Sequence, residues 1–423
     1  MQLKHFMLAV LVLVFTNLKA QDDKVLNEKE VNFLFNYYQQ DGDHSPVTGG
    51  KGTEKLECIA PLITVNIPVD TLNSFGMTVG VDYYSSASCD NIDMFVSGAS
   101  SQYLSSASRQ DVRGHGDIHY TRTRPSKHVS GTTTFGYSQE FDVISLSGGY
   151  KWQKASKNQN RDFSVGGNIF YDTWKIIKPG ELRYESTEFG NEEDNYNTDT
   201  RTTGTFSISY AQVLTKKLQI LFSSDIVYQN GILYTPFHRV FFNDFTCVDC
   251  EEESKFHLIE NLPRTRLKIP IGIRANYYIN DWLISRLYYR YYSDDFGIKS
   301  HTVSIELPIK ITRFFTVYPI YRFYTQTASK YFKPYGEHEM QLDTNYVPQA
   351  IEQYYTSDYD LSEFVNHKFG LGLKYSPLYG IAQIDISKER KIVFKKIEFR
   401  TVFYRRSDGL KAFTISFDTG FTF

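Results

Sequence analysis

The sequence predicts an all-β fold: a transmembrane antiparallel up-and-down β-barrel of about sixteen strands, within a range of about 14–18. Three observations predict it: apolar and polar residues alternate, the alternating stretches are long, and aromatic residues are abundant in a polar chain. Aromatics make up 16% of the 423 residues, with 32 Tyr and 32 Phe, yet the mean hydropathy is −0.38. This balance is typical of a barrel, in which half of each strand faces water and aromatic girdles mark both membrane interfaces.

The alternation is clearest in the last segment of the chain. Phe413, Ile415 and Phe417 fall on one face, and Thr414 and Ser416 fall on the other. A period of two indicates a strand whose two faces meet different surroundings. Residues 302–309 and 265–279 repeat this pattern. Many such stretches are closer to the ~9–11 residues of a membrane strand than to the ~5–6 of a soluble sheet.

Sixteen segments of the chain share this pattern and are the predicted strands. In order they are 31–40, 55–68, 74–84, 111–122, 128–138, 141–153, 162–173, 202–213, 218–229, 265–279, 282–292, 297–309, 314–325, 368–376, 395–404 and 410–423.

The lengths of the connections predict which ends of the strands lie outside the cell. Barrel termini normally lie on the periplasmic side, with short turns there and long loops outside. The five longest odd-numbered connections are 41–54, 85–110, 174–201, 230–264 and 326–367. Most even-numbered connections are short, as 214–217 and 280–281 are, but 377–394 is long and could hide a strand pair.

The two ends of the chain predict export to an outer membrane. Lys4 and the short apolar run 6–15 precede Leu18-Lys19-Ala20, which is typical of a signal peptide cleaved after residue 20. Residues 21–423 then form a single barrel domain in outer-membrane lipid. The final Phe423 resembles the signal read by the barrel insertion machinery. The net charge of −2 gives no indication of a nucleic-acid partner.

Basic residues concentrate on the predicted inner face of the C-terminal strands. Fixed positive charge in a water-filled lumen would favour anions. The alternative is a structural network of Arg and carboxylate side chains that braces a plugged barrel. Four acids share this face: Asp225, Glu306, Glu398 and Asp418. The candidate lumen and selectivity residues are Arg266, Lys268, Arg274, Arg286, Arg290, Arg322, Lys374 and Arg400.

Three smaller groups lie in the predicted external connections. Asp41, Asp43 and His44, with Asp90 and Asp93, could hold Ca²⁺ through oxygen ligands, or could form solvated turns. A pair of cysteines, Cys247 and Cys250, would form a disulfide outside the cell; a metal site, a redox role and no role are the alternatives. Polar residues at the mouth could bind a ligand or anchor loops to the rim: His238, Arg239, Asp244, Asp294, Asp295 and His301.

Short motifs along most of the chain resemble one family, an outer-membrane barrel family of unknown function in Gram-negative bacteria. They are NFLF at 32–35, DGDHS at 41–45, VDYYSSAS at 81–88, SGAS at 97–100, YTPFHRV at 234–240, YYRYY at 288–292, YRFYTQTA at 321–328, HKFGLG at 367–372 and RSDGLK at 406–411. The resemblance implies the barrel fold and no activity or cofactor. Members of this family tend to be encoded near a periplasmic flavin transferase and a thioredoxin-like protein, which implies periplasmic redox proteins as partners.

Three functions are compatible with these features. A porin-like channel or transporter for small polar or anionic solutes is the first expectation. A non-conducting scaffold or assembly partner of a periplasmic flavin or thiol system is the second. An outer-membrane enzyme with its site at the barrel mouth is the third, although no G-x-S-x-G nucleophile elbow is present and we expect no catalytic activity.

Overall fold

The computed structural model describes residues 28–84, 111–178, 182, 197–243, 255–387 and 390–423. The predicted signal peptide, at residues 1–20, lies outside this part of the chain. Among the described residues, no helix is both long enough and apolar enough to cross a membrane.

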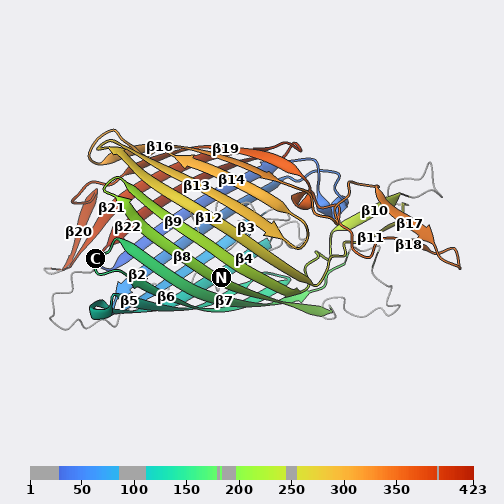
Figure 1. Cartoon of the computed structure of the whole chain (residues 1–423), viewed down its shortest axis with the longest axis horizontal. Helices are drawn as coiled ribbons and strands as arrows, with labels where there is room; N and C mark the ends of the chain where they lie inside the picture. The colour runs from blue at the N-terminus through green and yellow to red at the C-terminus, as the bar shows by residue number, and fades with distance from the viewer. Residues whose placement is uncertain (1–27, 85–110, 179–181, 183–196, 244–254, 388–389) are drawn as a thin grey trace.

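Sixteen antiparallel strands form the closed wall of the barrel, which confirms the predicted fold (Figure 1). Each strand pairs with its neighbours in chain order, as expected for an up-and-down barrel. The strands are β1 (Glu30–Asp41), β2 (Leu56–Pro68), β3 (Asn73–Tyr84), β4 (Asp111–Arg124), β5 (Val129–Gln139), β6 (Val143–Ala155), β7 (Arg161–Lys175), β8 (Thr198–Thr215), β9 (Leu218–Gly231), β12 (Thr265–Asn280), β13 (Leu283–Asp294), β14 (Lys299–Glu306) continued by β15 (Ile309–Lys310), β16 (Phe315–Gln326), β19 (Phe364–Tyr375), β21 (Arg390–Arg406) and β22 (Lys411–Thr422).

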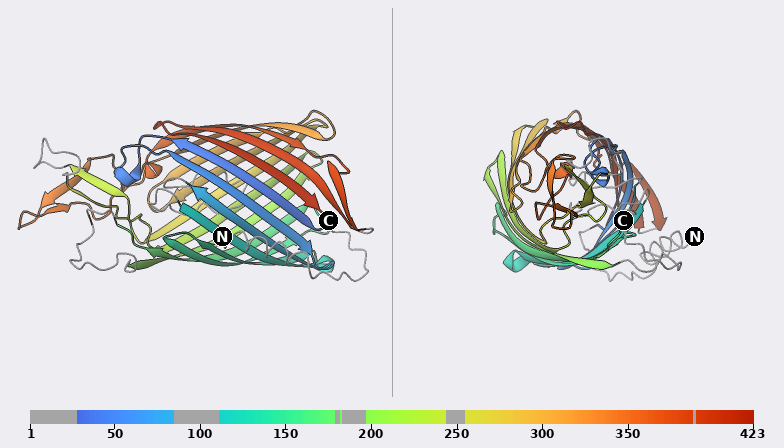
Figure 2. Two further views of the ribbon diagram at one scale, coloured as in Figure 1. Left: turned by 180° about the vertical axis from the view of Figure 1, so that it is seen from behind. Right: turned by 90° about the vertical axis from the view of Figure 1, so that its right-hand side faces the viewer.

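The barrel closes where its first and last strands pair. The register runs from Glu30 opposite Thr422 to Asp41 opposite Lys411 without a shift. The view along the barrel in Figure 2 shows the resulting ring of strands. Because the sheet has no open edge at this seam, all backbone groups of β1 and β22 can be paired within the wall, as a membrane requires.

The two faces of the wall differ as the alternation predicted. Large apolar side chains are exposed on the outer face, including Phe135, Ile169 and Phe403, each about 60% exposed. In a membrane protein such a belt contacts the lipid tails. Tyr289 and Tyr291 belong to this outer face and pack against His301. Their sequence neighbours Tyr288 and Tyr292 instead face the lumen, so the aromatic residues of 288–292 are divided between two surfaces.

Two predicted segments differ in detail from the observed strands. Segment 297–309 is interrupted at Pro308, which has no backbone N–H to donate to a neighbouring strand. The long connection 377–394 contains one additional strand, β20 (Ala382–Ser387), which pairs with an N-terminal extension of β21. The suspected strand pair is therefore a hairpin that lengthens a predicted strand, and the wall keeps sixteen strands.

The long connections fold into a separate structure at one end of the barrel, opposite the C-terminus (Figure 1). We call it the mouth assembly; it comprises residues 42–55, 232–264 and 327–363 as far as they are described. A small sheet is its centre, formed by β10 (Arg239–Asn243), β11 (His257–Ile259), β17 (His338–Leu342) and β18 (Pro348–Ala350). It also contains the short 3-10 helices η1 (Pro46–Thr48) and η5 (Tyr359–Leu361), whereas η2 (Pro125–Lys127) lies in a turn at the other end.

Candidate functional site

The strand register places every candidate selectivity residue on the inner face of the wall. On β12, the outward positions Leu267, Ile269 and Ile271 are exposed apolar residues, so Arg266 and Lys268 point to the lumen. The same alternation orients the remaining members. These are Arg274 on β12, Arg286 and Arg290 on β13, Arg322 on β16, Lys374 on β19 and Arg400 on β21.

Several of these cations form ion pairs with acids of the same face. Arg286 Nη1 lies 2.6 Å from Glu306 Oε1 on the adjacent strand. Glu398 lies 3.1 Å from Arg400 Nη2 and 3.8 Å from Lys374 Nζ. These contacts form an Arg–carboxylate network, which was one of the two interpretations of this face.

Cations nevertheless outnumber acids on the wall between β12 and β22. Arg266 is paired with Asp294 at 2.5 Å, and Lys396 with Asp418 at 2.5 Å. Among the described residues, Arg290 has no such carboxylate, and its Nε is buried without a hydrogen-bond acceptor. The basic members of this face are Arg266, Lys268, Arg274, Arg286, Arg290, Arg322, Lys368, Lys374, Lys396, Arg400 and Arg406; the acidic members are Asp294, Glu306, Glu398 and Asp418.

The N-terminal half of the wall carries charge that sequence reasoning missed. Arg201 Nε donates to Asp172 Oδ2 at 2.9 Å, and both side chains are buried. Arg113 lies 3.3 Å from Asp82. The sequence carries this signal for Asp82, which lies between the apolar residues Val81 and Tyr83, but not for Arg201, which lies between Thr200 and Thr202. The predicted basic face covered only the C-terminal strands.

The mouth assembly has a hydrophobic core of its own. Val240, Phe242, Met340 and Tyr355 are buried against one another. These residues come from two connections that are about a hundred positions apart in the sequence. Burial of such a cluster stabilises the assembly independently of the wall.

Two inner-face residues attach the mouth assembly to the lumen wall. Gln326 Nε2, at the end of β16, donates to the carbonyl oxygens of Asp360 at 2.9 Å and Ser362 at 2.6 Å. Arg406, at the end of β21, donates to Tyr359 O at 2.7 Å and forms an ion pair with Asp360. Helix η5 is therefore held on the lumen side of the rim, and connection 327–363 turns inward over the opening.

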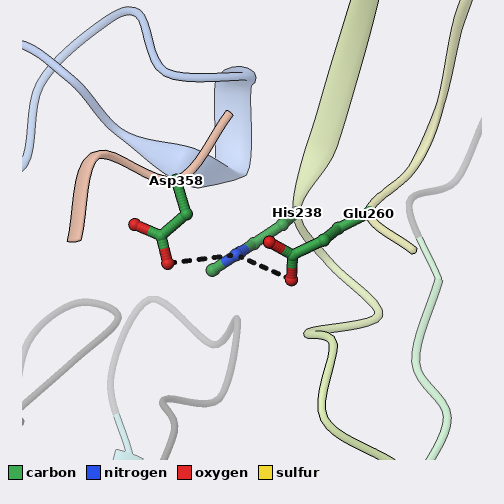
Figure 3. A group of neighbouring side chains, drawn as sticks. All are labelled: His238, Glu260 and Asp358. Carbon is green, nitrogen blue, oxygen red and sulfur yellow. Dashed lines mark ion pairs between the residues drawn. The ribbon is translucent and has the colours of Figure 1, made fainter. Parts of the chain in front are cut away.

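A buried cluster of ionisable residues joins the two main parts of this assembly. Figure 3 shows the ring of His238 between the carboxylates of Glu260 and Asp358. His238 Nδ1 lies 3.6 Å from Glu260 Oε2 and 3.9 Å from Asp358 Oδ2. His238 precedes β10, Glu260 follows β11, and Asp358 is the N-cap of η5. Among the described residues, it is the one group of His, Cys, Asp and Glu placed to hold a metal ion.

The surroundings of this cluster shift its pKa values. Burial disfavours the charged imidazole of His238, but the carboxylates of Glu260 and Asp358 outweigh that effect and raise its pKa. Burial, together with the nearby Asp360 carboxylate, raises the pKa of Asp358 to about 7. Perturbed groups gathered at one place are typical of functional sites.

The other predicted external residues do not gather in this way. Within the described residues, Asp41, Asp43 and His44 belong to no metal-ligating group; His44 Nδ1 instead contacts Gly50 O at 3.1 Å, and its ring stacks on Tyr359. Asp90, Asp93, Asp244 and the Cys247–Cys250 pair lie outside the described residues, so the predicted calcium site and disulfide remain predictions.

Of the predicted rim residues, His238 belongs to the buried cluster and three others hold segments in place. Arg239 Nη1 donates to Val47 O at 2.7 Å. Asp294 binds Arg266, and Asp295 accepts a hydrogen bond from Leu267 N. His301 faces outward beside Tyr289. Sequence reasoning missed Glu260 and Asp358, which carry no motif and meet His238 only in the folded chain.

Comparison with known proteins identifies the family of the chain. Residues 8–386 match a family model described as "Protein of unknown function (DUF3570)". No curated protein matches the sequence. Among solved structures, the siderophore receptor PirA from Acinetobacter baumannii is 11% identical with a TM-score of 0.42; the match covers 90% of this chain and 54% of the receptor.

Two further solved structures are similar at the same level. CdiB from Acinetobacter baumannii is 8% identical with a TM-score of 0.41, and 92% of this chain and 60% of that one are covered. A bacterial polysaccharide outer membrane secretin is 9% identical with a TM-score of 0.42, and the match covers 95% of this chain and 100% of the secretin. The chain thus spans about half the length of the receptors it matches.

Proposed function

We propose that this chain, which belongs to the DUF3570 family of proteins of unknown function, is an outer-membrane transport barrel for small anionic or polar solutes. The observation that carries the proposal is the excess of Lys and Arg over acids on the lumen face of β12–β22. Fixed positive charge lowers the electrostatic barrier for anions in a water-filled passage.

The size of the effect can be estimated from a single charge. A unit charge about 7 Å from a permeant ion, in surroundings close to bulk water, contributes about 0.6 kcal/mol. Removing one such cation should therefore lower the permeability of anions roughly threefold. Arg290 suits this test because its side chain has no carboxylate partner among the ion pairs of the described wall.

The experiment is planar-bilayer conductance of the refolded chain under a potassium chloride gradient. We expect discrete current steps and a reversal potential that indicates preference for chloride. Arg290→Gln and Arg322→Gln should each reduce that preference. Arg405→Gln, which changes an outward-facing arginine opposite His367, is the matched control and should leave it unchanged.

Two results would overturn the proposal. A correctly folded barrel that passes no current would show that the mouth assembly seals the lumen. Conducting channels whose selectivity is the same in Arg290→Gln, Arg322→Gln and wild type would show that these cations do not face the passage.

A further inference from the structure

The mouth assembly contains two buried histidines with very different surroundings. Both ring nitrogens of His338 have acceptors: Glu352 Oε2 lies 2.7 Å from Nδ1, and Thr356 O lies 3.0 Å from Nε2. His238 is 5% exposed, yet its Nδ1 is buried with no hydrogen-bond partner in the part of the chain that the structure describes. A buried polar atom without a partner costs free energy, so its persistence needs an explanation.

The distances around His238 are those of ligands that share an ion. At 3.6 and 3.9 Å, the carboxylate oxygens of Glu260 and Asp358 are too far from Nδ1 for hydrogen bonds. Two ligands bound at about 2.0–2.2 Å to one tetrahedral ion lie about 3.4 Å apart. The three ligand atoms all lie within 4.8 Å of one another, so small side-chain adjustments bring them to one ion.

Both carboxylates are oriented by neighbours that leave an oxygen facing the histidine. Glu260 accepts a hydrogen bond from Thr235 N at 2.8 Å and another from the hydroxyl of Thr356. Asp358 Oδ1 accepts from Asp360 N at 2.9 Å, while Oδ2 points to His238. Hydrogen bonds of this kind fix the direction of metal ligands and are typical of metal sites.

We infer that His238, Glu260 and Asp358 bind a divalent transition-metal ion of the zinc class. One imidazole nitrogen and two carboxylate oxygens suit such an ion better than Ca²⁺, which takes six to eight oxygen ligands. Three protein ligands leave a coordination position for water. A bound divalent ion would also compensate the negative charge of the carboxylates that ligate it.

Metal binding would connect parts of the mouth assembly that are distant in sequence. His238 and Glu260 flank the β10–β11 hairpin, and backbone bonds hold them together, with Glu260 N donating to His238 O at 2.9 Å. Asp358 belongs to the connection that Gln326 and Arg406 attach to the lumen rim. An ion at this position therefore fastens the hairpin to η5, above the opening of the barrel.

The test is zinc binding by the refolded full chain in detergent, measured by competition with a chromophoric chelator. We expect one Zn²⁺ per chain, and at least about tenfold weaker binding in His238→Ala, Glu260→Gln and Asp358→Asn. Co²⁺ should give visible absorption bands whose intensity indicates four or five ligands, and these bands should be lost in the same variants. This readout does not depend on conductance, so it is independent of the proposed transport function.

Matched controls separate this site from adventitious binding. His257→Gln changes a histidine of the same hairpin, and Asp343→Asn changes an acid of the same connection; both should bind as the wild type does. Asp358→Asn retains an oxygen to cap η5, so it keeps the inference testable even if His238→Ala fails to fold. Equal zinc affinity in wild type and a folded Asp358→Asn variant would overturn the inference, as would no binding at all by the folded wild type.

Discussion

The lumen wall and the mouth assembly both bury charge, but the excess has opposite sign in the two regions. On the wall, Glu306, Glu398 and Asp418 each contact a Lys or Arg, and cations remain in excess. In the mouth, Glu260 and Asp358 lie around one histidine. The basic excess on the wall faces the lumen, whereas the two carboxylates in the mouth face a histidine and the ion inferred to bind there.

The two regions also differ in what holds the charges. Wall residues are positioned by a continuous backbone register, so each side chain has a fixed place on a rigid sheet. Mouth residues are positioned by contacts between connections, and those contacts depend on a few buried side chains. Substitutions in the mouth should consequently affect local stability most, whereas those in the wall should affect solute selectivity.

The largest effect is expected from Arg406→Ala. Arg406 is 3% exposed and pairs with the half-exposed Asp360 and with the largely buried Asp408, so its removal leaves the buried Asp408 carboxylate without this partner. Breaking a buried pair costs about 3–5 kcal/mol. The backbone amides of connection 327–363 should exchange faster than in the wild type, whereas those of the wall strands should exchange at the wild-type rate. Arg405→Ala, on the outward face, is the control; equal exchange in both variants would mean that Arg406 does not attach the mouth to the wall.

A smaller loss of stability is expected from Thr356→Val. The hydroxyl of Thr356 donates to Glu260 and accepts from Asp358 N at 3.0 Å. Valine has the same shape, so the cost is that of unsatisfied buried groups, about 1–3 kcal/mol. Amide exchange in η5 should accelerate, and Thr344→Val at the exposed tip should show no change. Unchanged exchange in Thr356→Val would contradict the role of this hydroxyl.

Glu306→Gln tests whether the net fixed charge on the lumen wall determines ion selectivity. Glu306 partly neutralises Arg286, so its replacement should raise the preference for anions by up to roughly threefold. This shift is opposite to the one expected from Arg290→Gln, and both are read from the reversal potential. If both variants shift selectivity in the same direction, fixed charge on the wall does not determine it.

The smallest effect is expected in the pH dependence of the stability of connection 42–55. Burial raises the pKa of Glu54 above 4.5, so the folded connection favours the neutral carboxyl. The contribution of Glu54 to stability is fully present below the pKa of the unfolded chain, and it is lost as pH rises through the raised pKa of the folded chain. A protease should cleave the wild type faster in this connection at about pH 7 than at about pH 4. Glu54→Gln should remove the difference, and an unchanged trend would exclude burial of Glu54 as its cause.

The wall was predictable from sequence because the alternation within each strand assigns its side chains to a face without reference to distant residues. A period of two assigns Phe413 and Ile415 to one face and Thr414 and Ser416 to the other, whatever the partner strand is. The same rule placed Arg290 and Arg322 on the inner face. Tyr288 and Tyr289 follow the same alternation and lie on opposite faces of β13.

The mouth was not predictable because its contacts join residues that no periodic pattern relates. His238 appeared as a rim residue, but nothing in the sequence pairs it with Glu260 or with Asp358. Short strands such as β10 and β17 are five residues long and form a parallel bridge between separate connections. Such pairing depends on the tertiary structure and leaves no local signal.

The seam between β1 and β22 also constrains how the barrel can form. It pairs Glu30 with Thr422, so the contact that closes the ring joins residues almost the full chain apart. Contacts of such large sequence separation form slowly, because loop-closure entropy must be overcome first. Until the last strand pairs, the edges of β1 and β22 present free backbone groups that can pair with another chain. Closure kinetics, more than the stability of any single strand, should therefore limit the yield of folded protein.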